Sequence, residues 1–454
     1  MQSFEPIAAI STPYGRGGIA VVRMSGEGSA KLAEKMFVPK NGKPLSCIEH
    51  SKAVYGDIYF EGKKIDDGIA TVFYAPNSYT GEETVEISCH GGIILTQNVL
   101  TAALESGFRA ALAGEFTKRA FLNGKLSLTQ AEAVIGLIDA ESQEQLKLST
   151  SIMLGVLSKE LDNVCQELTN ILASVYAYID YPDEDLTDMS VDELISKTER
   201  VYTEIDKLCK SYRSGKAVSE GIKTVIVGKP NAGKSSLLNR FLGYNRAIVT
   251  DIAGTTRDTI EESATVGRVT LRLCDTAGIR DTPDKLESLG IDRSIEKLNE
   301  AELVIAVFDG SKPLDDEDNK LIELLNSSSA EKIYVLNKTD LQGKIVDFPY
   351  TAYEISALIG DGIEELENAI SALFVSEKLD YNTTPVIANA RQFASASLAK
   401  DHVHNALDAL MNGYTQDVAG MDLELALSSL KDIDGRGASE EITDRIFMRF
   451  CVGK

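Results

Sequence analysis

The chain has 454 residues, with 46 Lys and Arg against 69 Asp and Glu, and therefore a formal net charge of −23. At roughly 100–200 residues per domain this length predicts several domains, and 43% hydrophobic with 25% charged residues excludes global disorder. The acidic balance also excludes a protein that coats nucleic acid through its overall charge, so any such contact must be local or made through a partner.

The sequence contains no signal for a membrane or for export. No stretch approaches the ~20 apolar residues of a membrane-spanning helix, and the first residues lack the basic and apolar regions of a signal peptide. We therefore expect a cytoplasmic protein without a membrane partner. The 6 cysteines are widely spread and form no Cys-x-x-Cys pair, so neither a disulfide framework nor a structural zinc site is expected.

The first 120 residues predict a mixed α/β domain. Short apolar runs alternate with turns that are marked by Gly and Pro, which is typical of strands. Helices are expected at Ser29–Met36 and near Ile94–Leu104. The predicted strands include Ile7–Ile10, Ile19–Val22, Ile69–Phe73 and Val85–Ser88.

From about Leu128 to Gly215 the sequence predicts long helices. Thr129–Glu132 and Ser190–Glu193 have the pattern of capping boxes and predict two helix starts. Pro182 predicts a break between two helices. The apolar residues that share one helical stripe are Leu161, Val164, Leu168, Ile171, Leu172 and Val175.

Strands and helices alternate from Gly221 to about Phe374. Such alternation predicts a parallel sheet with crossover helices. A helical tail follows the α/β unit, and we expect it to pack against the earlier helices, which makes the α/β unit an insertion. The predicted strands are Thr224–Val227, Thr270–Asp275, Leu303–Asp309 and Ile333–Asn337, and the helices of the tail are Ala388–Met411, Asp422–Lys431 and Glu440–Phe450.

The sequence Gly228-Lys-Pro-Asn-Ala-Gly-Lys-Ser235 lies between a predicted strand and a predicted helix. This is the GxxxxGK[ST] spacing of a phosphate-binding loop, in which backbone amides and a helix N-terminus surround the phosphates. Lys234 is expected to reach the β- and γ-phosphates, and Ser235 is expected to bind Mg²⁺. The alternative is a glycine-rich surface turn.

Further motifs in the correct order indicate a guanine nucleotide. Asp275-Thr-Ala-Gly278 provides a carboxylate near Mg²⁺ and an amide near the γ-phosphate, and Thr255 or Thr256 offers Mg²⁺ a hydroxyl. Asp340, in Asn337-Lys-Thr-Asp340, can accept two hydrogen bonds from guanine that adenine cannot offer. Ser356-Ala-Leu358 can direct backbone amides at the guanine carbonyl.

The complete set of expected GTP contacts is Asn231, Ala232, Gly233, Lys234, Ser235, Ser236, Thr250, Asp251, Ile252, Ala253, Gly254, Thr255, Thr256, Asp275, Thr276, Ala277, Gly278, Asn337, Lys338, Asp340, Ser356, Ala357 and Leu358.

The site departs from simple GTPases after Gly278, where Ile279 stands in place of a water-positioning Gln. Arg280 is a candidate internal arginine finger, but a solvated arginine is the simpler interpretation. Glu287 is a candidate for polarising the attacking water, and the alternative is an exposed acid at a helix start.

Across essentially its whole length the chain resembles the MnmE (TrmE) family of tRNA-modification GTPases. The N-terminal blocks and the C-terminal Cys-x-Gly-Lys are more specific to this family than the nucleotide motifs. The blocks that carry the resemblance are Asn77–Glu82, Gly114–Lys125, Gly228–Asn239, Ile248–Asp258 and Phe450–Lys454.

The resemblance implies a multidomain α/β and α fold with three domains. An α+β folate-binding and dimerisation domain spans residues 1–120, and a discontinuous helical domain spans 121–216 and 379–454. A Ras-like P-loop GTPase domain is inserted at 217–378.

The resemblance also implies a function. Family members work with the flavoprotein MnmG, in a heterotetramer, to install an aminomethyl-type group at carbon 5 of the tRNA wobble uridine, using a folate one-carbon unit. The family's homodimer contacts tRNA largely through this partner complex, and its GTPase is stimulated by potassium. In this sequence the potassium ligands would be Asn231, Thr250, Ile252 and Thr255, and Glu287 matches the family's water-activating glutamate.

The residues that match the family's 5-formyl-tetrahydrofolate site are Arg23, Glu86, Lys125 and Lys454. Cations can pair with the carboxylates of folate, and Glu86 can accept hydrogen bonds from a pterin. Without the resemblance each would be interpreted as a surface ion-pair residue, and Cys451 as a small buried apolar side chain rather than a nucleophile. The alternative function is a ribosome-assembly or other regulatory GTPase, but the N-terminal blocks disfavour it.

Overall fold

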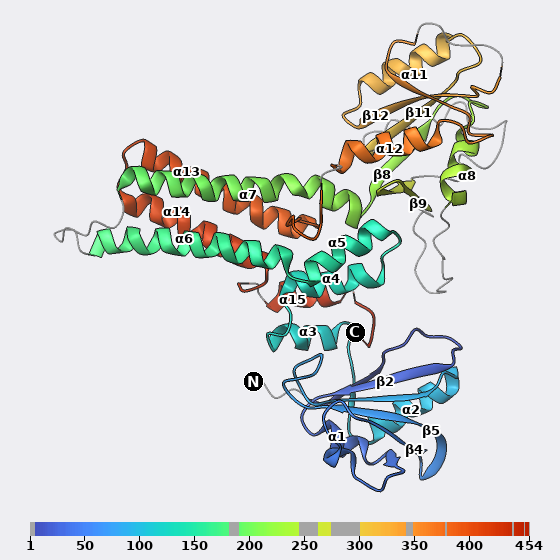
Figure 1. Ribbon diagram of the computed structural model, residues 1–454, viewed down its shortest axis with the longest axis vertical. Coiled ribbons are helices and arrows are strands. Elements are labelled where there is room, and N and C mark those ends of the chain that lie inside the picture. Colours follow the sequence, from blue (N-terminus) through green and yellow to red (C-terminus); the bar gives the residue numbers. More distant parts are fainter. Residues whose placement is uncertain are drawn as a thin grey trace. The chain divides into compact units, whose positions relative to one another are not determined.

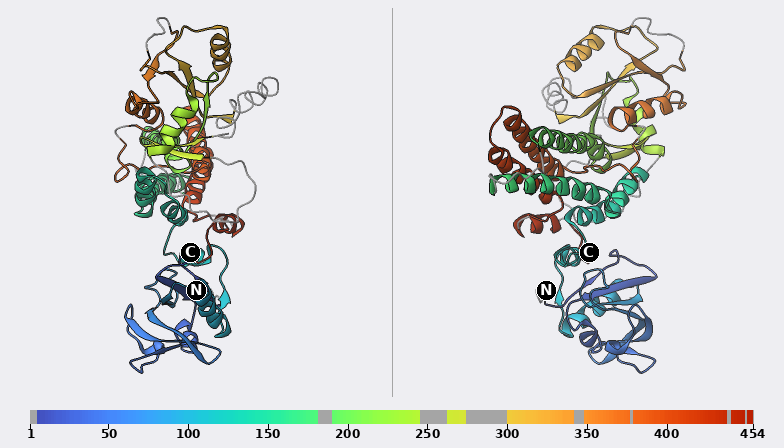
Figure 2. Two further views of the ribbon diagram at one scale, coloured as in Figure 1. Left: turned by 90° about the vertical axis from the view of Figure 1, so that its right-hand side faces the viewer. Right: turned by 60° about the vertical axis from the view of Figure 1, so that its left-hand side comes forward.

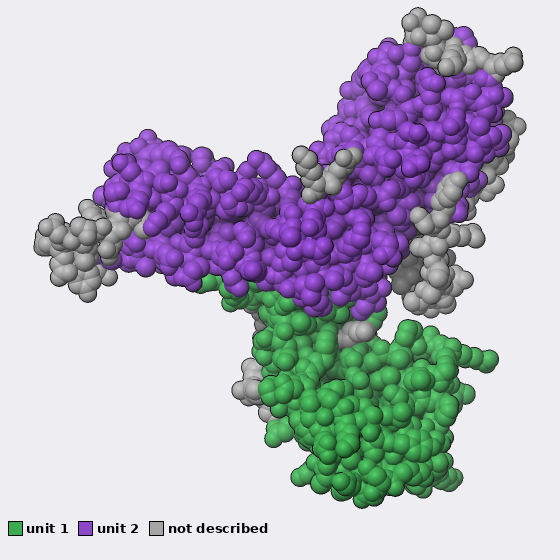
Figure 3. All heavy atoms as spheres, viewed as in Figure 1, with its two compact units in different colours: residues 1–135, 430–454 green, residues 136–429 purple. Residues whose placement is uncertain are grey.

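The computed structural model describes residues 5–180, 190–244, 262–273, 300–341, 348–376, 379–437, 440–448 and 450–453 (Figures 1 and 2). The chain divides into two compact units (Figure 3). Unit 1 contains residues 1–135 and 430–454, and unit 2 contains residues 136–429. No helix in the described ranges combines the length and the apolar character that crossing a membrane requires.

Unit 1 contains a seven-stranded sheet in the order β3-β4-β5-β6-β2-β1-β7. Neighbouring strands are antiparallel, except that β7 is parallel to β1. The strands are β1 (Ile7–Ile10), β2 (Ile19–Ser25), β3 (Phe37–Pro39), β4 (Ala53–Phe60), β5 (Lys63–Phe73), β6 (Thr84–His90) and β7 (Arg109–Ala110).

Helix α2 (Ile93–Glu105) packs on one face of this sheet (Figure 1). On β2 every second residue points into the core, and Val22 and Met24 are fully buried together with Val99 of α2. The alternation follows from the two-residue period of a strand. The other elements before the long helices are α1 (Ser29–Ala33), the short helix η1 (Leu45–Cys47) and α3 (Glu115–Leu122).

The C-terminal segment belongs to the same unit. Helix α15 (Glu440–Phe447) packs against α3, and the aromatic rings of Phe447 and Phe450 lie 5.1 Å apart. Gly114 has a φ of 66°, and a Cβ there would meet the Phe450 side chain at 2.9 Å, so the contact requires glycine. The last described residue, Gly453, accepts a hydrogen bond from the Ser11 hydroxyl at 3.0 Å.

Helix α4 (Leu128–Ile138) begins at a different cap from the one predicted. The Gln130 amide donates to the Ser127 hydroxyl at 3.3 Å, and the Gln130 side-chain oxygen accepts from the Ser127 amide at 2.9 Å. The capping box at Thr129–Glu132 is therefore wrong. Thr129 lies inside the helix, and its hydroxyl is buried against the carboxylate of Asp434 at 2.7 Å.

Unit 2 begins with long helices that lie side by side (Figure 1). Ser190 caps α7 by accepting a hydrogen bond from the Glu193 amide, so this predicted helix start is confirmed. The predicted stripe of α6 is buried throughout, from Leu161 to Val175. These helices are α5 (Gln143–Met153), α6 (Val156–Asp180), α7 (Val191–Ser219), α13 (Ala390–Met411) and α14 (Gln416–Ile433).

Helix α7, which precedes the α/β sheet, packs on α13, which follows it. The rings of Tyr212 and Phe393 stack at 4.4 Å, and the Ser219 hydroxyl donates to the Ala388 carbonyl at 2.5 Å. The helical segments on either side of the sheet therefore pack together. Helix α14 starts at Gln416, six residues before the predicted start at Asp422, and it therefore includes Gly420. A Cβ on Gly420 would lie 3.2 Å from the Val175 side chain of α6.

The α/β part of unit 2 is a six-stranded sheet in the order β13-β12-β11-β8-β10-β9. All neighbours are parallel except β9 and β10. The strands are β8 (Ile222–Val227), β9 (Glu262–Val266), β10 (Val269–Leu273), β11 (Leu303–Asp309), β12 (Glu331–Asn337) and β13 (Ala352–Ile355), and the helices are α8 (Lys234–Tyr244), α11 (Asp316–Asn326) and α12 (Ile363–Phe374).

The central strand β11 agrees with the prediction at both ends, and its residues Leu303–Phe308 are all buried. One set of alternate residues packs against Ile322 and Leu325 of α11. The parallel sheet with crossover helices is thereby confirmed. It brings the carboxyl ends of β8, β11 and β12 to one edge, which is where ligands bind in such sheets.

Candidate functional site

The loop from Gly228 to Ser235 connects the carboxyl end of β8 to the start of α8. Gly228 has a φ of 153° and Gly233 a φ of 97°. A Cβ on Gly228 would collide with the Val307 carbonyl, and a Cβ on Gly233 would collide with the side-chain amide of Asn337. Both glycines are therefore required by close packing, and the loop is a built structure rather than a loose surface turn.

Lys234 is the first residue of α8, and its side chain turns back over the loop. The ammonium donates hydrogen bonds to the carbonyls of Gly228 at 2.7 Å and Lys229 at 2.8 Å. Burial lowers the pKa of this ammonium. The first turn of any helix leaves backbone amides without intrahelical partners, and the helix dipole adds partial positive charge there. The loop thus gathers donors and positive charge, as an anion site requires.

Asn337, at the end of β12, joins the phosphate-binding loop to the loop after β13. Its side-chain nitrogen donates to the Ala232 carbonyl at 2.9 Å, and its side-chain oxygen accepts from the Ala357 amide at 2.9 Å. Only 2% of Asn337 is exposed, so these bonds are well shielded from water. The structure therefore brings the segments 228–235, 337–340 and 356–358 together.

Lys338 and Asp340, which follow Asn337 in the chain, bind different neighbours. The exposed carboxylate of Asp340 accepts a hydrogen bond from the Ser356 hydroxyl at 2.5 Å. Lys338 has a φ of 72°, and its ammonium donates to Asp309 at 2.6 Å. Burial alone would raise the pKa of Asp309, but the bonds from Lys338 and Ser311 outweigh it and lower that pKa.

In unit 1 the structure pairs two of the residues that were assigned to folate. Arg23 on β2 lies opposite Glu86 on β6, and the guanidinium donates to the carboxylate at 2.7 Å. The same guanidinium lies 5.3 Å from the centre of the Tyr79 ring and 5.7 Å from that of Phe116. Cation and aromatic faces at this distance attract each other.

Lys125 approaches the same cluster through the loop between β5 and β6. Its ammonium donates to the Pro76 carbonyl at 3.1 Å, and its stem lies against Gly81. Tyr79, in the same loop, contacts Arg23, so the segment 76–82 connects Lys125 with the Arg23–Glu86 pair. The carbonyl of Gly453 accepts a hydrogen bond from Ser11, and Ala9, two residues before Ser11 in the chain, pairs with Arg23 in the sheet. Cys451, in the same C-terminal segment, is exposed, so the expectation of a buried side chain is wrong.

A buried ion cluster that sequence reasoning did not identify supports this loop. Arg119 of α3 is 2% exposed and donates to Glu82 at 3.0 Å and to Glu115 at 2.8 Å. Burial alone would raise the pKa of Glu115, but hydrogen bonds from Arg109, from the Leu112 amide and from Arg119 lower it to about 2. The spacing of Glu115 and Arg119, four residues apart on one helix, was the available signal.

Comparison with known proteins is decisive for the family. Residues 128–451 match the family model "MnmE helical domain", and residues 6–125 match "GTP-binding protein TrmE N-terminus". The chain belongs to the MnmE family of tRNA modification GTPases. The inferred fold class, with a TrmE-type N-terminal domain, a helical domain and a P-loop α/β sheet, is thereby confirmed.

Relatives of the MnmE family match the chain almost from end to end. The proteins called tRNA modification GTPase MnmE from Clostridioides difficile and Carboxydothermus hydrogenoformans are 41% and 40% identical, and each alignment covers 99% of both chains. The protein of the same name from Lactococcus lactis subsp. lactis is 41% identical over 100% of this chain and 99% of its own length.

Several residues assigned by the MnmE resemblance lie outside the described ranges. The described ranges contain the loop 228–235, the segments 337–340 and 356–358, and three of the four residues that the resemblance assigns to folate. The assigned residues outside the described ranges are Thr250, Asp251, Ile252, Ala253, Gly254, Thr255, Thr256, Asp275, Thr276, Ala277, Gly278, Glu287 and Lys454. Arg280, the candidate arginine finger, also lies outside them.

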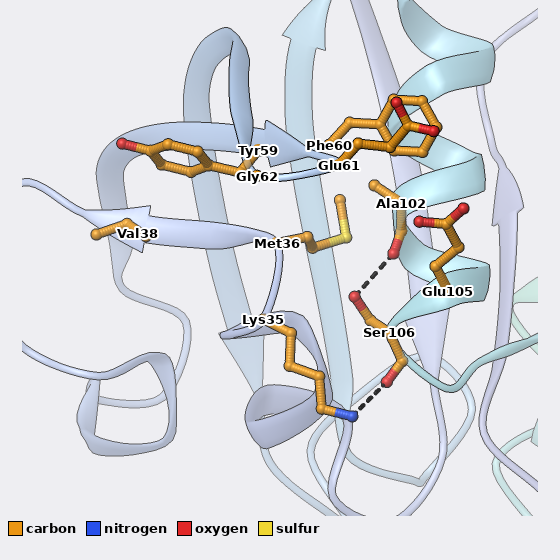
Figure 4. Close-up of a pocket in the computed structure, with 10 residues that line it drawn as sticks. All are labelled: Lys35, Met36, Val38, Tyr59, Phe60, Glu61, Gly62, Ala102, Glu105 and Ser106. Atoms are coloured by element: carbon orange, nitrogen blue, oxygen red, sulfur yellow. Dashed lines mark hydrogen bonds between the residues drawn. The ribbon is translucent and has the colours of Figure 1, made fainter.

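A separate surface hollow of about 450 Å³ lies in unit 1, between the β4–β5 hairpin and α2 (Figure 4). Its Lys35 ammonium donates to the Ser106 carbonyl at 2.8 Å, and the Ser106 hydroxyl donates to Ala102 at 2.7 Å. These groups are engaged within the protein, and none of the assigned residues of the MnmE family lines the hollow. We assign it no function.

Proposed function

We propose that this MnmE family member hydrolyses GTP to drive a modification at carbon 5 of the tRNA wobble uridine, together with the flavoprotein MnmG. One observation carries the proposal: in unit 2 Asn337 joins the loop 228–235 to the segment 356–358, and unit 1 of the same chain holds the Arg23–Glu86 pair and Lys125. A GTPase that acts only as a switch has no need of the second cluster.

At the nucleotide site, Lys234 and the first amides of α8 bind the phosphates, and Asp340 selects guanine. Ser235 and Thr256 bind Mg²⁺, which neutralises phosphate charge. Asn231, with the backbone carbonyls of Thr250, Ile252 and Thr255, would hold a potassium ion, which would supply positive charge beside the phosphates.

Glu287 orients the attacking water in this proposal, because the position after Gly278 is occupied by Ile279 and offers no side-chain hydrogen-bonding group. The surrounding GTPase fold then needs a second contribution of positive charge, which the potassium ion supplies. Dimerisation of the chain across the nucleotide face fits this arrangement, and we propose a homodimer that contacts tRNA largely through the MnmG complex.

In unit 1, Arg23, Lys125 and Lys454 bind the carboxylates of a 5-formyl-tetrahydrofolate or a related folate, and Glu86 accepts hydrogen bonds from its pterin. The fit is supported by the Arg23–Glu86 pair at 2.7 Å, because both members lie on one face of the sheet next to Tyr79. Bound folate would exchange the Arg23–Glu86 ion pair for charge-assisted hydrogen bonds of its own.

The test is a complementation experiment in cells that lack the gene. Mass spectrometry of tRNA nucleosides should show loss of a wobble-uridine modification, restored by the wild-type gene and not by Lys234→Ala. A second measurement compares GTP turnover of the purified protein in potassium and in sodium, and a higher rate in potassium is expected. An unchanged nucleoside profile contradicts the tRNA function, and equal turnover rates contradict the potassium site.

A further inference from the structure

Arg240 of α8 holds the loop that follows β13. Its Nε donates to the Ala357 carbonyl at 3.3 Å, and its Nη2 donates to the Leu358 carbonyl at 2.8 Å. Gly360, with a φ of 97°, lies directly against the guanidinium, because a Cβ there would be 3.3 Å from Cζ. One side chain thus donates hydrogen bonds to two successive carbonyls of the segment that faces the guanine base in the proposed site.

The peptide bond between Leu358 and Ile359 connects the Arg240 hydrogen bonds to Asp340. In a trans peptide the C=O and the N–H point in opposite directions, so a fixed Leu358 carbonyl also fixes the Ile359 amide. That amide donates to the Ser356 hydroxyl at 3.4 Å, and the same hydroxyl donates to the Asp340 carboxylate at 2.5 Å. Arg240 is thereby connected to the group that reads guanine.

A second connection leads to Asn337. Arg240 binds the carbonyl of Ala357, and the amide of Ala357 donates to the side-chain oxygen of Asn337 at 2.9 Å. Asn337 in turn binds the phosphate-binding loop at Ala232. Both polar groups of Ala357 are thus held in place, one by α8 and one by the end of β12.

Hydrophobic burial does not orient the tip of this loop. Leu358 is 77% exposed and Ile359 is 64% exposed, so neither side chain anchors it. A hollow of about 470 Å³ separates the loop from α8 and is lined by Ser236, Asn239, Arg240, Gly243 and Ala357. Across this gap the Arg240 hydrogen bonds hold the carbonyls of Ala357 and Leu358.

We infer that Arg240 is a positioning residue for guanine selection: it holds segment 356–360, and through it Asp340, in the orientation that accepts the exocyclic amine of the base. The inference rests on the proposed GTP binding. It predicts that loss of Arg240 weakens the binding of guanine nucleotides more than the binding of inosine nucleotides, because inosine lacks the amine that Asp340 recognises.

The experiment measures the dissociation constants of GDP and IDP by calorimetry, with Mg²⁺ present, for the full-length protein. For Arg240→Ala we expect the constant for GDP to rise about five- to twentyfold and that for IDP about twofold, so the preference for GDP falls severalfold. Arg240→Lys keeps one cationic donor and should lie between Arg240→Ala and wild type. Asn239→Ala is the matched control, because it removes a polar side chain from the same hollow and leaves Arg240 in place.

Equal weakening of GDP and IDP in Arg240→Ala would overturn the inference, since it would mean that Arg240 only stabilises α8. An unchanged preference in both Arg240 variants would do the same while leaving GTP binding intact. Failure of the wild-type protein to bind GDP would instead refute the proposed nucleotide function itself. If Arg240→Ala does not fold, as judged by circular dichroism, the comparison of Arg240→Lys with wild type decides alone.

Discussion

The nucleotide site of unit 2 and the charged cluster of unit 1 are built in different ways. The nucleotide site uses short contiguous segments whose side chains bind backbone groups, as Asn337 does with Ala232 and Ala357. The cluster in unit 1 uses charged side chains that lie far apart in the sequence, such as Arg23 and Glu86, and that meet through the register of the sheet. A local motif thus specifies the first, and the fold assembles the second.

The two regions also differ in what their stability depends on. Neutral hydrogen bonds to the backbone change little with pH, whereas the ion pair between the buried Arg119 and Glu115 requires the ionised carboxylate of Glu115. Removing one partner of a buried ion pair leaves an uncompensated charge, which is strongly destabilising. Unit 1 should therefore be the more acid-sensitive of the two regions.

The largest effect is expected for Lys234→Ala. Loss of two charge-assisted contacts to the phosphates should raise the dissociation constants of GTP and GDP by about a thousandfold, and calorimetry measures this change. Affinity for 5-formyl-tetrahydrofolate should stay unchanged, because its proposed site lies in unit 1. Parallel loss of folate binding would show that the two regions are not independent.

The second-largest effect is expected from low pH, which should destabilise unit 1 more than the nucleotide site. The pKa of Glu115 falls from its ordinary value of 4.5 to about 2 on folding, so the unfolded chain binds the proton more tightly. This pKa shift adds roughly 3 kcal/mol to the free energy of unfolding. The contribution is present above about pH 4.5 and is lost as the pH falls towards 2. Urea unfolding followed by circular dichroism should show Glu115→Gln less stable than wild type at pH 7, with the gap narrowing near pH 3. A gap that is independent of pH would contradict this assignment.

Asp340→Asn tests the base-recognition end of the nucleotide site. The substitution replaces a carboxylate acceptor with an amide that also donates, so GDP should weaken by about a hundredfold and xanthosine diphosphate should bind better. Competition binding with the two nucleotides measures the change. Unaltered guanine selectivity would remove Asp340 from its proposed role, and Lys234→Ala provides the contrast because it should weaken both nucleotides equally.

The smallest effect is expected for Lys125→Ala. Its side chain is exposed, and one of several cations is lost, so affinity for 5-formyl-tetrahydrofolate should fall about tenfold while GDP binding is retained. Equilibrium dialysis with the folate measures the change. Lys52→Ala, an exposed lysine elsewhere in unit 1, is a suitable control and should leave both affinities unchanged.

Elements that carry their own periodicity were predicted from the sequence. The apolar run Leu303–Asp309 marks a strand buried on both faces, and the structure places β11 on the same residues. The α6 stripe and the Ser190 cap were predicted for the same reason, since the determining residues lie within one or two helical turns. Among the site residues, those between Gly228 and Ser235 follow from spacing alone, because the turn itself requires glycine and the helix start attracts the anion.

The tertiary structure decided which distant residues meet. Thr129 has the sequence pattern of a cap, yet its hydroxyl bonds to Asp434 because the end of α14 lies beside α4 within unit 1. The spacing of Glu115 and Arg119 indicates one ion pair of Arg119 but not its bond to Glu82, and no motif marks Arg240 as a partner of the 356–360 loop; chain folding brings these distant groups together. Hydrogen bonds and ion pairs act over a few ångströms, so a sequence determines them alone only where the partners are near neighbours along the chain.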